Sequence, residues 1–287
     1  LITFWNERLN FQQDGISWGH RKDLIFVIVA SFIAGMIAKI PAIFTINDDF
    51  FYPRNIGFIV FPALAAFFAW KNHLSARKIG FTGAAMLGGL IFSNSLPNIE
   101  QSDTLILSCI HLVLFLWCIL GFVFVGEFKN HDEKRLSFLK YNGDLVVMTT
   151  LIVIAGGIMT GITINLFAVI ALNIEEFWFN NIVAFGLPAA PIFGTYLTQA
   201  NPQLVGKVSP VIAKIFSPLV LVMLLIYLAA IAYSGKNPYN DREFLLIFNA
   251  LLIGVMAIIF FSVAEPSRTK SMAEVWVLFL LSVVTMI

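Results

Sequence analysis

Charged residues are scarce in this sequence. They make up 12% of its 287 residues, whereas hydrophobic residues make up 59% and the mean hydropathy is +0.87. Soluble domains carry roughly 25% charged residues, so this composition excludes a soluble globular class and predicts a multi-span membrane protein. The net charge is only +1, and no cluster of lysine and arginine stands out, so we expect no nucleic-acid partner.

Cysteine is rare, and the common catalytic motifs are absent. The two cysteines, Cys109 and Cys118, lie nine residues apart in one apolar run. That spacing fits no metal knuckle or redox pair and is too long for a bridge within one helix. No HExxH, GxSxG, Walker, CxxC or nucleotide-binding pattern occurs. The sequence therefore predicts no metal site and no cofactor, and it leaves open whether the protein is an enzyme.

Long apolar runs dominate what remains. A helix needs roughly 20 apolar residues to cross the hydrocarbon core of a bilayer. Nine runs are candidate spans: 24–44, 55–70, 79–95, 104–126, 145–172, 181–198, 211–233, 243–264 and 274–287. They predict an all-α, polytopic transmembrane helical bundle. Because the sequence opens without methionine and ends inside an apolar run, we expect it to be an excerpt of a longer protein.

The basic residues between the spans favour a cytoplasmic N-terminus. In that orientation the inner segments hold 13 lysines and arginines, whereas the outer segments hold three: Arg54, Lys236 and Arg242. Such an excess of positive charge on one side is the positive-inside pattern, and the outer segments are acidic. Lys39 and Lys214 fall within spans near their ends, where long side chains generally extend toward the interface.

Two stretches of the chain are versions of one pattern. Residues 48–52 (DDFFY) and 175–179 (EEFWF) each hold two acids and three aromatics. An Asn-Ile pair follows, at Asn55 and at Asn181, and Pro-Ala comes seven residues after each asparagine. Weaker matches in the same order relate the first four spans to the next four. Since four is an even number, the sequence predicts tandem parallel four-span repeats.

This repeat divides the sequence into five parts. They are a cytoplasmic or interfacial N-terminal segment (1–22), a four-span repeat (23–127), a cytoplasmic amphipathic linker (128–143), a second four-span repeat (144–265), and a linker with the start of a further span (266–287). The alternative is chance similarity, because apolar helices draw on few residue types.

The paired acids of the repeated pattern are the first candidate site. Asp48 with Asp49, and Glu175 with Glu176, could bind a cation or a basic group, or exchange a proton. Arg54 lies in the same outer segment as the first pair and is a further ligand-binding candidate. The alternative is a solvated loop above the belt of aromatic residues that a membrane interface attracts.

A polar run at a second outer boundary, residues 237–243, is the next candidate. Tyr239, Asp241, Arg242 and Glu243 could form a ligand clamp in which the arginine holds a phosphate or carboxylate. The alternative is helix capping by Asn240 or Asp241, with Glu243 in the first turn near the positive end of the helix dipole. Capping does not explain Arg242, because a cation at a helix N-terminus opposes that dipole.

Four polar residues inside the spans need partners: Lys39, His111, Asn165 and Asn249. In hydrocarbon such side chains generally face the bundle interior and bond another helix. They predict either hydrogen bonds between helices or the lining of a hydrophilic path, such as a proton relay.

Proline and glycine mark two further features. Pro188 and Pro191 make the sixth span the best candidate for a broken helix, although ordinary kinks are the simpler explanation. Small residues repeat at a spacing of four on the third span (residues 80–88) and on the fifth, at Gly157 and Gly161. These faces predict close helix packing and, with it, a homo- or hetero-oligomer.

Five segments of the chain are similar to those of a known family: 214–220 (KIFSPLV), 237–244 (NPYNDREF), 261–265 (FSVAE), 48–51 (DDFF) and 61–66 (FPALAA). On these segments the chain resembles a bacterial multi-pass membrane family catalogued as domain-of-unknown-function family 4153. The resemblance covers most of the chain and is most specific at 214–265. It implies the bacterial cytoplasmic membrane and a longer native protein, and it supplies no catalytic or binding residue.

Three classes of function remain. A transporter, or a protein that translocates lipid or a small molecule, is favoured by the parallel repeats, the interrupted spans and the polar residues at matching depths. An outward-facing enzyme acting on lipid-linked or envelope substrates is favoured by the acid pairs and Arg242. A scaffold or sensor subunit needs none of these residues. The expected partners are the bilayer and an unknown lipid or small-molecule ligand.

Overall fold

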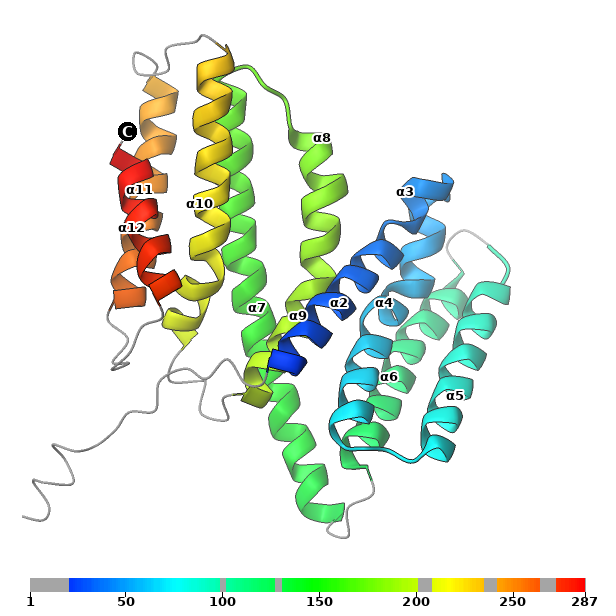
Figure 1. Ribbon diagram of the computed structural model, residues 1–287. Coiled ribbons are helices and arrows are strands. Elements are labelled where there is room, and N and C mark those ends of the chain that lie inside the picture. The colour runs from blue at the N-terminus through cyan, green and yellow to red at the C-terminus, as the bar shows by residue number, and fades with distance from the viewer. Residues whose placement is uncertain are drawn as a thin grey trace, which may run out of the picture. The chain divides into compact units, whose positions relative to one another are not determined.

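The computed structural model describes residues 21–98, 102–126, 131–200, 208–234, 242–263 and 272–286, and within these ranges it is helical with no strand (Figure 1). The α-helices are α2 (Arg21–Ala38), α3 (Ile40–Phe44), α4 (Asp48–Lys71), α5 (Ala76–Ser95), α6 (Asp103–Val125), α7 (His131–Val169), α8 (Glu175–Phe177), α9 (Ala184–Ala200), α10 (Val208–Ser234), α11 (Arg242–Val263) and α12 (Met272–Met286). A π-helical turn, η1 (Trp178–Val183), joins α8 to α9. The predicted all-α class is confirmed.

Six of these helical stretches are long and apolar enough to cross a membrane. They are α4, α6, α7 from Asp132, the continuous stretch Glu175–Ala200, α10 from Ile212, and α11 from Phe244. The chain is therefore a multi-pass membrane protein. The other three predicted spans also lie on helices, but α2 carries three charges at its start, α5 is rich in Gly, Ser and Asn, and α12 has 15 residues. The count of nine spans stays a prediction.

Helix α4 begins earlier than the sequence predicted. Residues 48–52 were expected in a loop before a span at 55, but the helix starts at Asp48. The Asn47 side chain caps it, accepting hydrogen bonds from the backbone N–H groups of Asp49 at 2.7 Å and Phe50 at 3.3 Å. Asp48 and Asp49 then lie in the first turn, where the helix dipole favours negative charge.

Helix α7 is longer than expected. The sequence predicted a separate amphipathic linker over 128–143 and a span from 145, whereas one helix of 39 residues covers His131–Val169. No proline interrupts this stretch, so nothing in the backbone forces a break between the charged first turns and the apolar remainder.

The chain packs as two compact units, which are described separately. In the first, built from residues 19–153 and 176–199, α4 packs against α2, α5 and α6 (Figure 1). Its core holds Phe67, Phe68, Leu116 and Leu120, each at most 2% exposed. These units follow other boundaries than the predicted four-span repeats, because residues 176–199 pack with the first unit.

The second unit is built from residues 154–175 and 200–287. Within it α10 packs against both α11 and α12. Its core includes Leu166 from α7, Val220 and Leu224 from α10, Leu251 from α11 and Leu281 from α12. Apolar side chains therefore hold this unit together by close packing, which is the main source of helix association in a membrane.

Candidate functional site

Arg54 is a buried cation on α4. Its side chain is 1% exposed, and its Nη1 donates to the Phe50 carbonyl oxygen at 3.1 Å. Its Nη2 donates to the Asn98 Oδ1 at 3.3 Å and lies 3.5 Å from the Pro97 carbonyl oxygen. The guanidinium also stacks 4.2 Å from the centre of the Phe50 ring. All of these partners are neutral.

The Arg54 charge has no counter-ion within the described ranges, where no carboxylate oxygen lies within 4.0 Å of it. Its Nε, moreover, is buried without a hydrogen-bond partner. An isolated ion removed from water costs several kcal/mol unless another charge or strong hydrogen bonds offset it. Arg54 therefore retains capacity for an anion, and it is the best-supported candidate among the residues that the sequence singled out.

A polar contact between α4 and α5 fixes the position of Arg54. The Asn55 Nδ2 donates to the Asn94 Oδ1 at 3.1 Å, and the Asn94 Nδ2 donates back to the Asn55 Oδ1 at 2.9 Å. The Ser93 hydroxyl donates to the Arg54 carbonyl oxygen at 3.1 Å. The sequence had marked Asn55 only as part of a repeat. The sequence did contain a signal for this contact: Asn94 and Asn98, four residues apart, place polar side chains at the C-terminal end of α5.

A pocket of about 700 Å³ opens beside Arg54, between α4 and α6. Its polar lining residues are Asn47, Asp49, Arg54 and Asn98. Its apolar lining residues are Phe50, Pro53, Ile56, Leu105, Ile106, Cys109, Ile110 and Val113. Polar groups thus gather near the N-terminal end of α4, while the α6 wall is apolar. Of the predicted site residues, the structure brings Asp49 and Arg54 together here.

The predicted acid pairs lie at helix starts. Asp48, Asp49, Glu175 and Glu176 are all exposed, and the Asn173 Oδ1 accepts from the Glu175 N–H at 3.1 Å, as Asn47 does for α4. No group of three or more histidine, cysteine or acidic side chains suited to a metal occurs in the described parts of the chain. Helix capping accounts for the position of both pairs. A role in binding stays a prediction.

The Lys39 side chain was expected to extend toward the interface, but in the structure it bonds another part of the chain. Its Nζ donates to the Asn181 Oδ1 in the π-helical turn η1, and the Asn181 Nδ2 donates to the Phe177 carbonyl oxygen at 2.8 Å. The turn itself is closed by the Ala184 N–H donating to the Phe179 carbonyl oxygen. The sixth span is therefore not unwound at its prolines, and its irregularity is a π turn that precedes Pro188.

The other polar residues inside spans make no hydrogen bond to another helix among the described residues, and their predicted role in lining a hydrophilic path stays a prediction. His111, Asn165 and Asn249 are exposed on the surface of the chain. The His111 Nδ1 lies 2.8 Å from the Leu107 carbonyl oxygen, and the Asn165 Nδ2 donates to the Gly161 carbonyl oxygen at 2.7 Å. His111 and Asn165 thus each bond the carbonyl oxygen four residues back on their own helix.

Part of the predicted clamp lies outside the described residues. Tyr239 and Asp241 fall there, and so does the side chain of Glu243, although its backbone belongs to α11. Arg242 is the exposed first residue of α11. The clamp stays a prediction.

The small-residue faces named from the sequence are open at their glycines in the part of the chain that the structure describes. A Cβ placed on Gly157, Gly161, Gly80 or Gly88 would meet no atom within 4 Å. These four positions are open among the described residues, and the association of helices through these faces stays a prediction. Close packing occurs elsewhere, for example at Gly57, where a Cβ would lie 2.7 Å from the Leu116 Cδ1.

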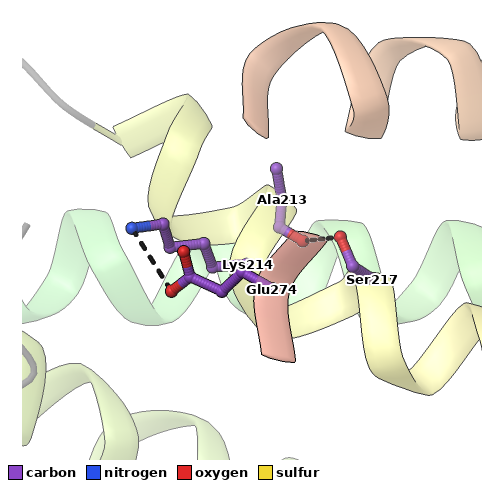
Figure 2. A network of polar contacts seen from close by, with 4 residues as sticks. All are labelled: Ala213, Lys214, Ser217 and Glu274. Atoms are coloured by element: carbon purple, nitrogen blue, oxygen red, sulfur yellow. Dashed lines mark hydrogen bonds and ion pairs between the residues drawn. The ribbon is translucent and has the colours of Figure 1, made fainter. Parts of the chain in front are cut away.

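The second unit holds an ion pair between α10 and α12. Figure 2 shows Lys214 and Glu274 pointing toward one another, with the Lys214 Nζ 3.8 Å from the Glu274 Oε1. Their side chains are 8% and 28% exposed. One turn along α10, the Ser217 hydroxyl donates to the Ala213 carbonyl oxygen at 2.6 Å. Lys214 is therefore paired rather than extended toward the interface, which the sequence did not predict.

Comparison of the chain with protein-family models, with curated proteins and with solved structures gives no match. The resemblance drawn above from residues 214–265 stays a prediction. The site is therefore defined by its own geometry. It is the pocket beside Arg54, which combines an apolar wall with a buried cation that has no counter-ion among the described residues.

Proposed function

We propose that this multi-pass membrane protein binds and translocates a lipid or a small amphipathic molecule. The observation that carries the proposal is the buried Arg54 guanidinium, which lines a pocket of about 700 Å³ and has only neutral partners among the described residues. Charged side chains within membrane segments are costly and commonly mark the path of a substrate or ion.

The pocket suits a molecule that is polar at one end and apolar along its length. Ile56, Ile106 and Ile110 line it and are 57%, 55% and 54% exposed. In a bilayer, side chains exposed in this way face acyl chains rather than water. A ligand can therefore reach the pocket sideways from the membrane, with its polar end near Arg54.

The wider arrangement proposed for the chain has a cytoplasmic N-terminus, nine spans, parallel repeats, a place in the bacterial cytoplasmic membrane and an acidic outer face. One similarity supports a duplication. Asn55 and Asn181 hold equivalent places in the sequence pattern, and each donates to the carbonyl oxygen four residues before it. The open faces at Gly80 and Gly157 leave room for the proposed oligomer.

The proposal is tested with the purified chain in proteoliposomes. Fluorescent phospholipids are placed in both leaflets, and a membrane-impermeant quencher added outside reports the fraction that exchanges between leaflets. We expect the wild-type chain to accelerate exchange and Arg54→Gln to lose that effect. Arg77→Gln is the matched control, because Arg77 is exposed at the start of α5. Exchange no faster than in protein-free vesicles would reject translocation of phospholipids.

An outward-facing enzyme is the second candidate. The observation that favours it is that an acid and a cation, Asp49 and Arg54, line the same pocket. An enzyme of this kind would convert its lipid substrate, so mass spectrometry of lipids incubated with the chain would detect a new product. Translocation alone leaves every lipid mass unchanged.

A further inference from the structure

Resting on the function proposed above, we propose that the Arg54 pocket selects a phospholipid whose headgroup carries a primary amine beside the phosphate. In this arrangement Arg54 binds the phosphate, Asp49 binds the amine, and an acyl chain lies along the exposed wall of α6. Each of the three contacts follows from a separate feature of the pocket.

The phosphate contact follows from the state of Arg54. The guanidinium is 1% exposed, its Nε has no hydrogen-bond partner, and its Nη2 makes only long contacts to Asn98 and Pro97, at 3.3 and 3.5 Å. A phosphate can accept two parallel N–H bonds from one guanidinium, and such charge-assisted bonds are about twice as strong as neutral ones. A phosphate would therefore supply both the missing partner and the missing negative charge.

The amine contact follows from Asp49. This carboxylate is exposed and lines the same pocket, and no ion pair involves it among the described residues. Arg54 reaches back along α4 to the carbonyl oxygen of Phe50, the residue that follows Asp49. Beside a purely anionic headgroup, Asp49 would be repulsive. A headgroup with an ammonium next to its phosphate instead gives each charge in the pocket a partner of opposite sign.

The acyl-chain contact follows from the helical spacing of the α6 wall. Ile106, Ile110 and Val113 lie on one side of α6 and all line the pocket. They extend over roughly 10 Å of helix at 1.5 Å per residue. This wall begins beside the polar end of the pocket, so one molecule can contact both.

Cys109 provides a built-in reporter, because it also lines this pocket and is a partly buried free thiol. With Cys118→Ser as the background, the purified chain in a neutral detergent is treated with N-ethylmaleimide and the rate of modification is measured. Four short-chain lipids are added as protecting ligands: phosphatidylethanolamine, phosphatidylglycerol, phosphatidylcholine and diacylglycerol. Inorganic phosphate is tested in parallel.

We expect phosphatidylethanolamine to protect Cys109 at a concentration about fivefold lower than phosphatidylglycerol, the effect of one exposed ion pair. Asp49→Asn should abolish that difference. Asp48→Asn is the matched control, because Asp48 is the neighbouring acid and does not line the pocket. Arg54→Gln should weaken protection by both lipids roughly tenfold or more, as expected for a lost charge-assisted hydrogen bond.

Three results would overturn the proposal. Protection by diacylglycerol as strong as that by phosphatidylethanolamine would mean that the pocket recognises only the acyl chains. Protection by phosphatidylglycerol at the same or a lower concentration than phosphatidylethanolamine would remove the role of Asp49. Protection by inorganic phosphate alone, as strong as by lipid, would make this a site for a free anion. Arg54→Lys, which keeps the charge, separates loss of binding from loss of folding, and a melting curve is recorded for each variant.

The outcome is distinguishable from failure of the translocation proposal. Protection with the expected selectivity, but no leaflet exchange in proteoliposomes, would establish a lipid site in a protein that does not translocate lipid. Exchange that survives Arg54→Gln, with no protection of Cys109, would reject this site while leaving translocation in place.

Discussion

The ring of Phe185 lies directly against Gly35. A Cβ built on this glycine would sit 2.2 Å from the Phe185 Cδ1, a distance that no side chain can adopt without moving the ring. Gly35 belongs to α2 and Phe185 to α9, and a second aromatic on α2, Phe32, has its ring centre 5.7 Å from that of Phe185. The absence of a side chain at Gly35 is what lets these two helices meet.

Gly35→Ala should lower the free energy of unfolding by about 1 to 3 kcal/mol, as overpacking of a tight contact generally does. Thermal denaturation in detergent, followed by circular dichroism, measures the change. Gly80→Ala is the control, because a Cβ there meets nothing within 4 Å. A second change that replaces the ring with a smaller side chain, Phe185→Leu, should recover part of the lost stability. An unchanged melting temperature for Gly35→Ala would contradict the contact.

Tyr141→Phe should destabilise the protein by about 0.5 to 1.5 kcal/mol, the usual contribution of one hydrogen bond. The Tyr141 hydroxyl lies 2.8 Å from the Thr195 hydroxyl, and the ring packs against Phe68 and Phe124. The phenylalanine variant keeps the ring contacts and removes only the hydrogen bond. Tyr233→Phe should have no measurable effect, because Tyr233 is 90% exposed. Equal effects of the two changes would argue against a role for the hydroxyl pair.

The reciprocal bonds between Asn55 and Asn94 should appear as a coupling energy. We expect the double variant Asn55→Ala with Asn94→Ala to cost less than the sum of the single variants, by about 0.6 to 1.7 kcal/mol. A double-mutant cycle in detergent measures this quantity. Strictly additive effects would mean that the two amides do not stabilise the contact between α4 and α5.

Lys214→Met should destabilise the second unit by about 1 to 2 kcal/mol, because it removes the ion pair with the partly buried Glu274. Exchanging the two residues, Lys214→Glu with Glu274→Lys, should restore much of the loss. Lys140→Met is a suitable control, because Lys140 is an exposed lysine. Failure of the exchanged pair to recover any stability would indicate that the attraction between these charges is not what holds Lys214.

The features that depend on composition along the chain could be predicted from the sequence. Apolar length and the absence of polar breaks indicated membrane helices, and every predicted span overlaps at least one helix in the described part of the chain. The predicted starts of the helices were less accurate. The Asn47 cap moved the start of α4 to Asp48, and this depends on two hydrogen bonds to one side chain that composition does not reveal.

The features that depend on which helices are neighbours could not be predicted. His111 and Asn165 were expected to face other helices, but an all-apolar membrane helix has no polar face to indicate its rotation, and both residues bond their own helix. Arg54 was counted among outer loop residues. Its burial depends on Pro97 and Asn98, more than 40 positions away in the sequence, and no local pattern records that contact.

The π turn at Trp178–Val183 determines how this part of the chain can change in length. A π turn holds one residue more than the α-helical turn that it replaces. Deleting a single residue here would therefore close the turn into a regular α-helical turn, and the residues on either side would keep their directions. The same deletion inside α9 would instead rotate the residues on one side of it by about 100° around the axis. The π turn is thus the place where this helix can lose one residue with only a local change, at Asn181 and its bond from Lys39.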